Sequence, residues 1–145
     1  MATGTRFARK RSTKIALDTA LFVGFIVEFV TREPSFDPDY LLHSWTGIVL
    51  MPVIALHLAG NWGWVKRVWA NKAADREFRL GVLNAVLGAL AWACIISGFP
   101  LWLDWSSAGW LAGLHTLTGM VAILLMFVHL YWNRRRIGAL VRPRP

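Results

Sequence analysis

Cysteine is almost absent from this sequence: Cys94 is the only one in 145 residues, and it lies inside an apolar run. The chain therefore has no disulfide framework and no CxxC or CxxCH motif, so any metal-bearing group would be held by coordination alone. Cys94 itself is expected to be a small packed hydrophobic residue.

Acidic residues are also scarce, with 8 Asp and Glu against 16 Lys and Arg, whereas 56% of the residues are hydrophobic. A mean hydropathy of +0.45 is too high for an ordinary soluble domain and indicates a polytopic membrane protein. The net charge of +8 does not indicate nucleic acid, because the cations lie in blocks between apolar runs. Such blocks orient membrane proteins, so the expected contact is with membrane lipid, and no nucleic acid partner is expected.

Four apolar runs predict four helices, at about 15–31, 41–60, 80–99 and 111–133. A signal peptide would also begin with cations and an apolar run, but the first run lacks a small-residue cleavage site. The Lys and Arg counts of the successive flanking segments are 5, 1, 5, 0 and 5, which places both termini in the cytoplasm. The expected fold class is all-α, with one integral membrane four-helix bundle over residues 1–145.

All four histidines lie in two similar segments, 43–58 and 115–130. Each segment begins with H-x2-T-G, and the spacing from His43 to His57 equals the spacing from His115 to His129, which indicates an internal two-helix repeat. Over this spacing a helix turns through about 1400°, close to four full turns, and rises about 21 Å. Both imidazoles of a segment therefore leave the same helix face at well separated depths.

The predicted topology places the histidines at two levels. The second and fourth helices both run from outside to inside, so His43 and His115 lie near the outer boundary, and His57 and His129 near the inner one. Two imidazoles at one level are suitable axial ligands for a six-coordinate haem iron. We therefore predict two haem b groups, the outer one on the first pair and the inner one on the second.

Small and hydroxyl residues follow the outer histidines. Gly47 and Gly119 lie one helical turn deeper, where a side chain would meet a porphyrin, although both could equally serve close helix packing. The second ring nitrogen of each imidazole needs an acceptor that fixes its tautomer. Backbone carbonyls and the hydroxyls of Thr46 and Thr118 are the candidates.

Other functions are compatible with histidines in membrane helices. A zinc or copper site is a poor fit, because each level offers only two histidines and neither ligand helix has a carboxylate or cysteine nearby. The remaining alternatives are a haem-free four-helix membrane scaffold and a proton-coupled transporter that uses the histidines together with Asp18 and Glu28.

The sequence HLAGNWGWVK at 57–66, preceded by the H-x2-T-G motif that begins at His43, carries a family resemblance. It resembles the small di-haem membrane cytochromes of the flavinylation-associated cytochrome family and, more loosely, the cytochrome b subunits of hydrogenases and formate dehydrogenases. The second copy departs from the first, because Trp132 and Asn133 follow its last histidine in reversed order and at closer spacing.

The resemblance covers nearly the whole chain and implies a four-helix bundle with two b haems on the four histidines. It implies an electron-transfer protein, or the membrane subunit of an oxidoreductase, in a bacterial inner (cytoplasmic) membrane. Expected partners are a quinone or quinol and a separate redox protein that bears a flavin or a metal.

Two acidic residues lie within the first apolar run. An ionisable residue costs about 2.5–3.5 kcal/mol at the centre of a span, so its presence invites a functional interpretation. Glu28, near the outer end, is a candidate proton acceptor for a quinol, although a glutamate so close to the interface can also extend to water. Asp18 lies one helical turn after Lys14 and is expected to pair with it on one helix face.

Overall fold

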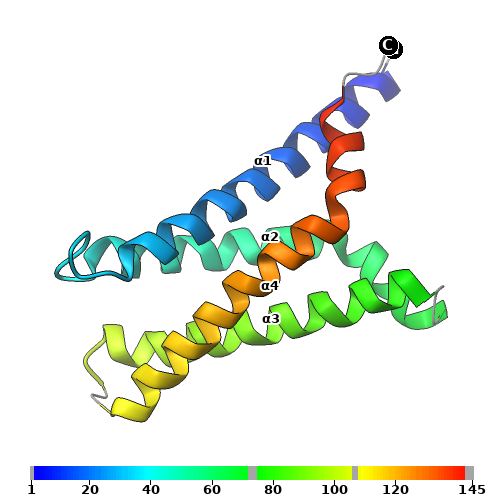
Figure 1. Ribbon diagram of the computed structural model, residues 1–145. Helices are drawn as coiled ribbons and strands as arrows, with labels where there is room; N and C mark the ends of the chain where they lie inside the picture. Colours follow the sequence, from blue (N-terminus) through cyan, green and yellow to red (C-terminus); the bar gives the residue numbers. More distant parts are fainter. Residues whose placement is uncertain (1, 72–74, 106–107, 143–145) are drawn as a thin grey trace. The chain divides into compact units, whose positions relative to one another are not determined.

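The computed structural model describes residues 2–71, 75–105 and 108–142. Nearly all of these residues belong to four α-helices (Figure 1). The helices are α1 (Ala2–Thr31), α2 (Leu41–Asn71), α3 (Asp75–Trp102) and α4 (Gly109–Val141). The predicted all-α fold class is confirmed, and every helix extends beyond its apolar run.

The helices differ from the predicted bounds because they continue into the polar residues that flank each apolar run. The segment 61–79 lies between two predicted helices, but α2 continues unbroken through its first half. Straight-chain cations are good helix formers, and no proline follows Pro52 to end the helix. Likewise α3 passes Gly98 and ends at Trp102, because Pro100 in the last turn removes only one backbone donor.

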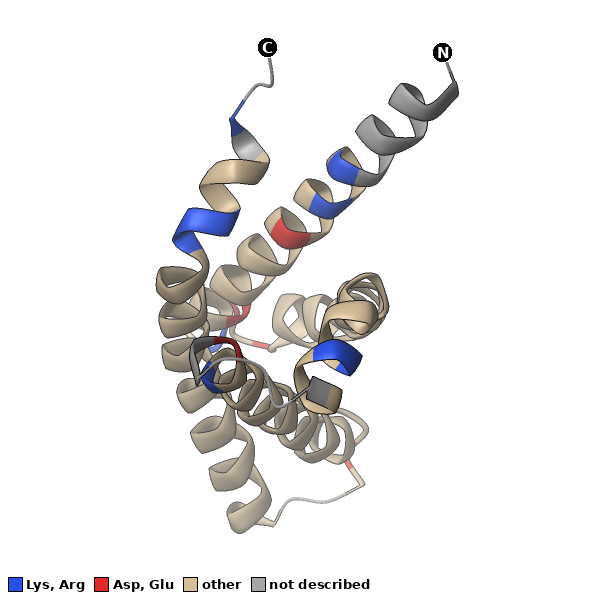
Figure 2. Ribbon diagram, turned by 90° about the vertical axis from the view of Figure 1, so that its right-hand side faces the viewer, with Lys and Arg blue, Asp and Glu red and all other residues tan. Residues whose placement is uncertain are grey.

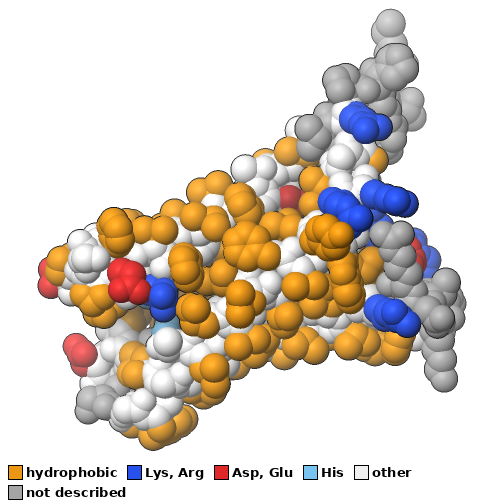
Figure 3. Space-filling view, viewed as in Figure 1, with side chains coloured by type: hydrophobic (Ala, Val, Ile, Leu, Met, Phe, Trp, Pro, Cys, Tyr) orange, Lys and Arg blue, Asp and Glu red, His pale blue; other side chains and the backbone are white. Residues whose placement is uncertain are grey.

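Three helices are long and apolar enough to cross a membrane, over Leu41–Ala70, Glu77–Trp102 and Gly109–Leu140. In their most apolar stretches only 6%, 22% and 17% of the residues are buried, respectively, so most of the apolar side chains face outward. Figure 3 shows this as hydrophobic side chains over much of the visible helix surface. Outward-facing apolar surface on this scale is typical of proteins that are covered by lipid.

The helix α1 is long but is not among these three. Lys14, Asp18 and Glu28 lie within or beside its apolar run, and Figure 2 shows an acidic residue partway along α1. In α2, α3 and α4 the charged residues lie toward a helix end. The prediction that α1 is a fourth membrane span therefore requires polar partners for these charged side chains.

The chain divides into two compact units. The first comprises residues 1–64 and 133–145, and in it α1 and α2 form an antiparallel helix pair joined by residues 32–40. Gly24 allows a close approach of α1 to α2, because a Cβ at this position would collide with Leu50. Arg11 closes the other end of this unit by donating hydrogen bonds to the carbonyls of Leu140, at 2.7 Å, and Arg142.

The second unit comprises residues 65–132 and holds the antiparallel pair α3 and α4. The last turns of α2 also belong to this unit and pack on the beginning of α3. Val68 is fully buried and occupies the space that a side chain at Gly81 would need, while Trp69 meets Phe78 edge to face with ring centroids 5.8 Å apart. Each unit is thus built around one helix pair whose second helix carries two histidines.

Candidate functional site

His43 lies in the first turn of α2, and the preceding connection fixes it there. The carboxylate of Asp37, a buried residue, accepts a 2.8 Å hydrogen bond from the His43 backbone N–H. Tyr40 has a left-handed backbone with φ of 52°, and its carbonyl accepts the first helical bond from Ser44 N–H at 2.9 Å. The buried acid thereby satisfies a donor that every helix start leaves without an intrahelical partner.

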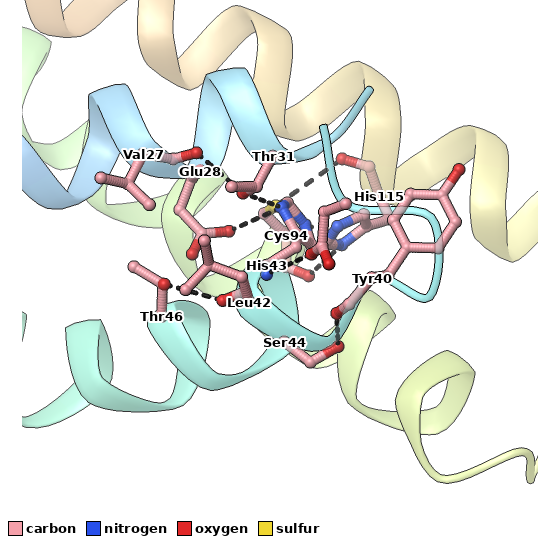
Figure 4. A network of polar contacts seen from close by, with 11 residues as sticks. Val27, Glu28, Thr31, Tyr40, Leu42, His43, Ser44, Thr46, Cys94 and His115 are labelled. Atoms are coloured by element: carbon pink, nitrogen blue, oxygen red, sulfur yellow. Dashed lines mark hydrogen bonds and ion pairs between the residues drawn. The ribbon is translucent and has the colours of Figure 1, made fainter. Parts of the chain in front are cut away.

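The imidazole of His43 faces α1, as Figure 4 shows. Its Nδ1 lies 3.1 Å from Oε2 of Glu28 and 3.4 Å from Oγ1 of Thr31. The Thr31 hydroxyl donates to the Val27 carbonyl at 2.7 Å, so it can offer only its lone pairs to Nδ1, and Glu28 is the acidic residue beside the ring. The glutamate that the sequence marks as a proton acceptor therefore contacts a predicted outer haem ligand, and its proton exchange stays a prediction.

His57 faces α1 in the same way, with Nδ1 2.9 Å from Oδ1 of Asp18. This ion pair is at hydrogen-bond length but not in hydrogen-bond alignment, because Oδ1 is buried and accepts no aligned bond from the described residues. Asn61 supports His57 by donating to its carbonyl at 2.8 Å, and it accepts a 2.9 Å bond from Lys14 Nζ. The prediction that Asp18 pairs with Lys14 is wrong, since α2 offers each of them a partner.

His115 reaches the backbone of α3. Its Nδ1 lies 2.9 Å from the carbonyl oxygen of Cys94, and the Cys94 thiol lies 3.5 Å from the same nitrogen. A carbonyl oxygen can only accept, so this bond places the ring proton on Nδ1. Gly98 makes the approach possible, because a Cβ there would lie 2.6 Å from Cε1 and 2.7 Å from Nδ1 of the ring.

His129 also contacts α3, through a side chain. Its Nδ1 lies 2.6 Å from Oδ1 of Asn84. With the amide oxygen toward the ring, Nδ1 is the donor, and the proton is again on that nitrogen. Asn84 therefore contacts His129 in the same way as Asp18 contacts His57: Oδ1 faces Nδ1 of the ring.

One rule covers all four histidines: Nδ1 faces an oxygen on the first helix of the same pair. The oxygens come from Glu28, Asp18, the Cys94 carbonyl and Asn84. At His115 and His129 the hydrogen bond to oxygen places the proton on Nδ1, leaves the lone pair on Nε2 and orients the ring. Histidines that bind metals in proteins almost always have such a partner on the other nitrogen, so this donor set fits an axial ligand.

The contacts also reveal a repeat that the histidine segments do not show. One offset relates Asp18 to Asn84 and Glu28 to Cys94, and it is shorter than the offset that relates His43 to His115. At the shorter offset the sequence LDTAL at 17–21 aligns with LNAVL at 83–87. The similarity was visible in the sequence, but only at an offset other than the one that aligns the histidines.

The glycines of the H-x2-T-G segments lie against the neighbouring helix of their own pair, and the threonines bond to their own helix. A Cβ at Gly47 would lie 3.8 Å from the Glu28 carboxylate, and one at Gly119 would lie 3.3 Å from the Cys94 sulfur. Both positions thus agree with close helix packing, while their role beside a porphyrin stays a prediction. Thr46 donates to the carbonyl of Leu42, and Thr118 donates to that of Leu114, both at 2.7 Å.

The hydroxyls of Thr46 and Thr118, which the sequence suggested as possible partners of Nδ1, therefore bond elsewhere. The other possibility, a backbone carbonyl, is realised at His115.

Conventional metal centres need more ligands than any one histidine and its neighbour supply. Within the part of the chain that the structure describes, no group of three or more His, Cys, Asp or Glu side chains is placed to hold a metal ion. Carboxylates do lie beside His43 and His57, but they come from α1 and contact Nδ1. Axial coordination of haem takes only two protein ligands, so the haem prediction does not depend on such a cluster.

Each histidine and the oxygen that faces its Nδ1 belong to the same unit. His43 and His57 belong to the first unit, and His115 and His129 belong to the second. The predicted pairs, His43 with His115 and His57 with His129, each take one histidine from either unit, and they stay predictions.

Comparison with known proteins gives no relative: no protein-family model, no curated protein and no solved structure matches the chain. The function is therefore argued from the four histidine sites themselves.

Proposed function

We propose that this chain is a membrane cytochrome that holds two haem b groups, with His43 and His115 as axial ligands of an outer haem and His57 and His129 of an inner one. The observation that carries the proposal is the shared environment of the four Nδ1 atoms. An oxygen faces Nδ1 in all four cases, and at His115 and His129 the hydrogen bond to it favours the ring form that coordinates through Nε2.

The pairing itself rests on the sequence. The equal spacing of the histidines in the two segments, together with the two intervening crossings, puts histidines with the same place in the repeat at the same depth. Gly47 and Gly119 would then border the outer haem as well as α1 and α3.

The proposal includes α1 as a fourth span, with both termini in the cytoplasm. The acids that make α1 less apolar are the two that contact histidines on α2, at 2.9 and 3.1 Å. Burying a carboxylate beside a polar partner costs much less than burying it alone, so these contacts offset the penalty of placing α1 in lipid. The alternation of cations between connections then sets the orientation.

A bound haem iron takes up and releases single electrons, which is chemistry that the side chains of this chain do not supply. The protein's part is to fix the imidazoles, exclude water by its apolar helices and connect the two sides of a membrane. Electrons would enter from a quinol or a redox protein and leave to a separate flavin- or metal-bearing partner. A bacterial inner membrane is the expected location.

A proton-coupled transporter is the second candidate, and the ion pairs of His57 with Asp18 and His43 with Glu28 favour it, because carboxylate and imidazole chains relay protons in membranes. The second unit argues against it. There the partners are an amide and a backbone carbonyl, which do not titrate, yet the histidines are held in the same way.

A reduced-minus-oxidised spectrum of the purified protein tests the proposal. We expect the bands of low-spin haem b and two haems per chain, with all of the haem extracted by acidified acetone because no CxxCH motif holds it covalently. Protein that was produced with an ample haem supply and has no haem absorbance would leave the transporter as the better candidate.

A further inference from the structure

Asp18 and Asn84 are matched in place but not in charge. They occupy equivalent positions of the repeat that relates α1 to α3, and their side chains have the same shape. Each presents Oδ1 to Nδ1 of an inner-level histidine, at 2.9 and 2.6 Å. One carries a negative charge when ionised and the other is neutral. Such a pair is suited to control a property that depends on charge rather than on shape.

We propose that Asp18 and Asn84 are positioning residues that jointly set the reduction potential of the inner haem, by giving it one anionic and one neutral partner. The inference rests on the proposed function, because it needs His57 and His129 to share one iron. Reduction lowers the charge at the iron by one, so an anion hydrogen-bonded or ion-paired to a ligand stabilises the oxidised form. Each added carboxylate should lower the potential, and each one removed should raise it.

The surroundings of Asp18 support a role in tuning. Asp18 is the charged side chain that contacts the His57 ring directly, whereas the contact of Lys14 is with Asn61. Asn61 donates to the His57 carbonyl and lies 3.4 Å from Nε2 of the ring. The Asp18 side chain is 34% exposed and that of His57 is 32% exposed. A covering of lipid in place of water would strengthen the effect of this charge on the ring.

The experiment is a reciprocal exchange: Asp18→Asn, Asn84→Asp and the double variant. Redox titration followed by haem absorbance should show the inner haem shifted upward in Asp18→Asn and downward in Asn84→Asp, by on the order of tenfold in the reduction equilibrium, which is about 59 mV for one electron. The double variant should return close to the parent. Haem content should stay at two per chain, because each exchange keeps the oxygen that faces Nδ1.

Glu28→Gln is the matched control. It also replaces a carboxyl group on α1 by its amide beside a histidine, His43, but at the other level, so it should leave the inner haem unchanged. Asp18→Asn alone decides the matter if Asn84→Asp fails to accumulate, because it removes a charge from an apolar helix without changing shape.

The possible outcomes separate the inference from the proposed function. Two haems with an unmoved inner potential in Asp18→Asn would overturn the role of Asp18 and leave the cytochrome intact. Shifts of two different haems in Asp18→Asn and Asn84→Asp would overturn the sharing of one iron. A parent protein without haem would overturn the proposed function and the inference together.

Discussion

At the scale of the residue, one missing side chain decides where His115 lies. Gly98 lets the ring reach the Cys94 carbonyl, and any larger residue would occupy the same space. The predicted helix ends at residue 99, between Gly98 and Pro100, whereas α3 continues past both. The real function of this glycine could not be predicted, because it depends on the side chain that faces it from another helix.

Gly98→Ala should displace the imidazole of His115. Alanine gains about 1 kcal/mol of helix propensity over glycine, but the new methyl group would lie 2.6 and 2.7 Å from two ring atoms. Overpacking typically costs about 1–3 kcal/mol, and rotation of the ring relieves it at the cost of the bond to Cys94. We expect loss of the outer haem from most molecules, measured as a haem content that falls from two toward one per chain.

Gly88→Ala is the control on the same helix. A Cβ at Gly88 meets no atom within 4 Å, so this change should keep both haems and leave thermal stability equal or slightly raised. Equal haem content in the two alanine variants would contradict the role assigned to Gly98.

At the scale of the element, the apolar runs predict the number and order of the helices but not their ends. Each helix continues into flanking polar residues, because helix formation needs backbone bonds and tolerates cations once the apolar core has nucleated it. The histidine positions were also predictable, since spacing fixes a helix face. Their partners on α1 and α3 were not, because an antiparallel neighbour can slide by several residues without changing the apolar pattern of either helix.

The orientation of the helices is tested by cysteine labelling in a Cys94→Ala background, which keeps the backbone carbonyl that His115 contacts. Ser35→Cys, in the connection between α1 and α2, should react with an impermeant thiol reagent added to intact cells. Ala70→Cys, near the end of α2, should react only after the membrane is permeabilised. The two sites flank one span, so each is the control for the other.

Reaction of both cysteines in intact cells would mean that α2 does not cross the membrane as proposed. Reaction of Ala70→Cys alone would reverse the orientation, and the outer and inner haems would exchange names.

At the scale of the whole molecule, the chain is two helix pairs of the same design, each with two histidines held from the first helix by Nδ1. Neither pair alone offers two histidines at one level, since the helix between them makes about four turns and rises about 21 Å. The proposed function therefore assigns to each haem one histidine from each pair.

Four alanine variants test this pairing. His43→Ala and His115→Ala should each remove the same haem, and His57→Ala and His129→Ala should each remove the other, because one imidazole holds a b haem far more weakly than two. The measurements are haem content, expected to fall from two to one per chain, and redox titration, which identifies the remaining haem by its potential. Variants of one helix, such as His43→Ala and His57→Ala, should leave different haems behind. If these two left the same haem, the ligands would be paired along a helix rather than across the repeat, and the exchange of Asp18 with Asn84 would then act on two irons instead of one.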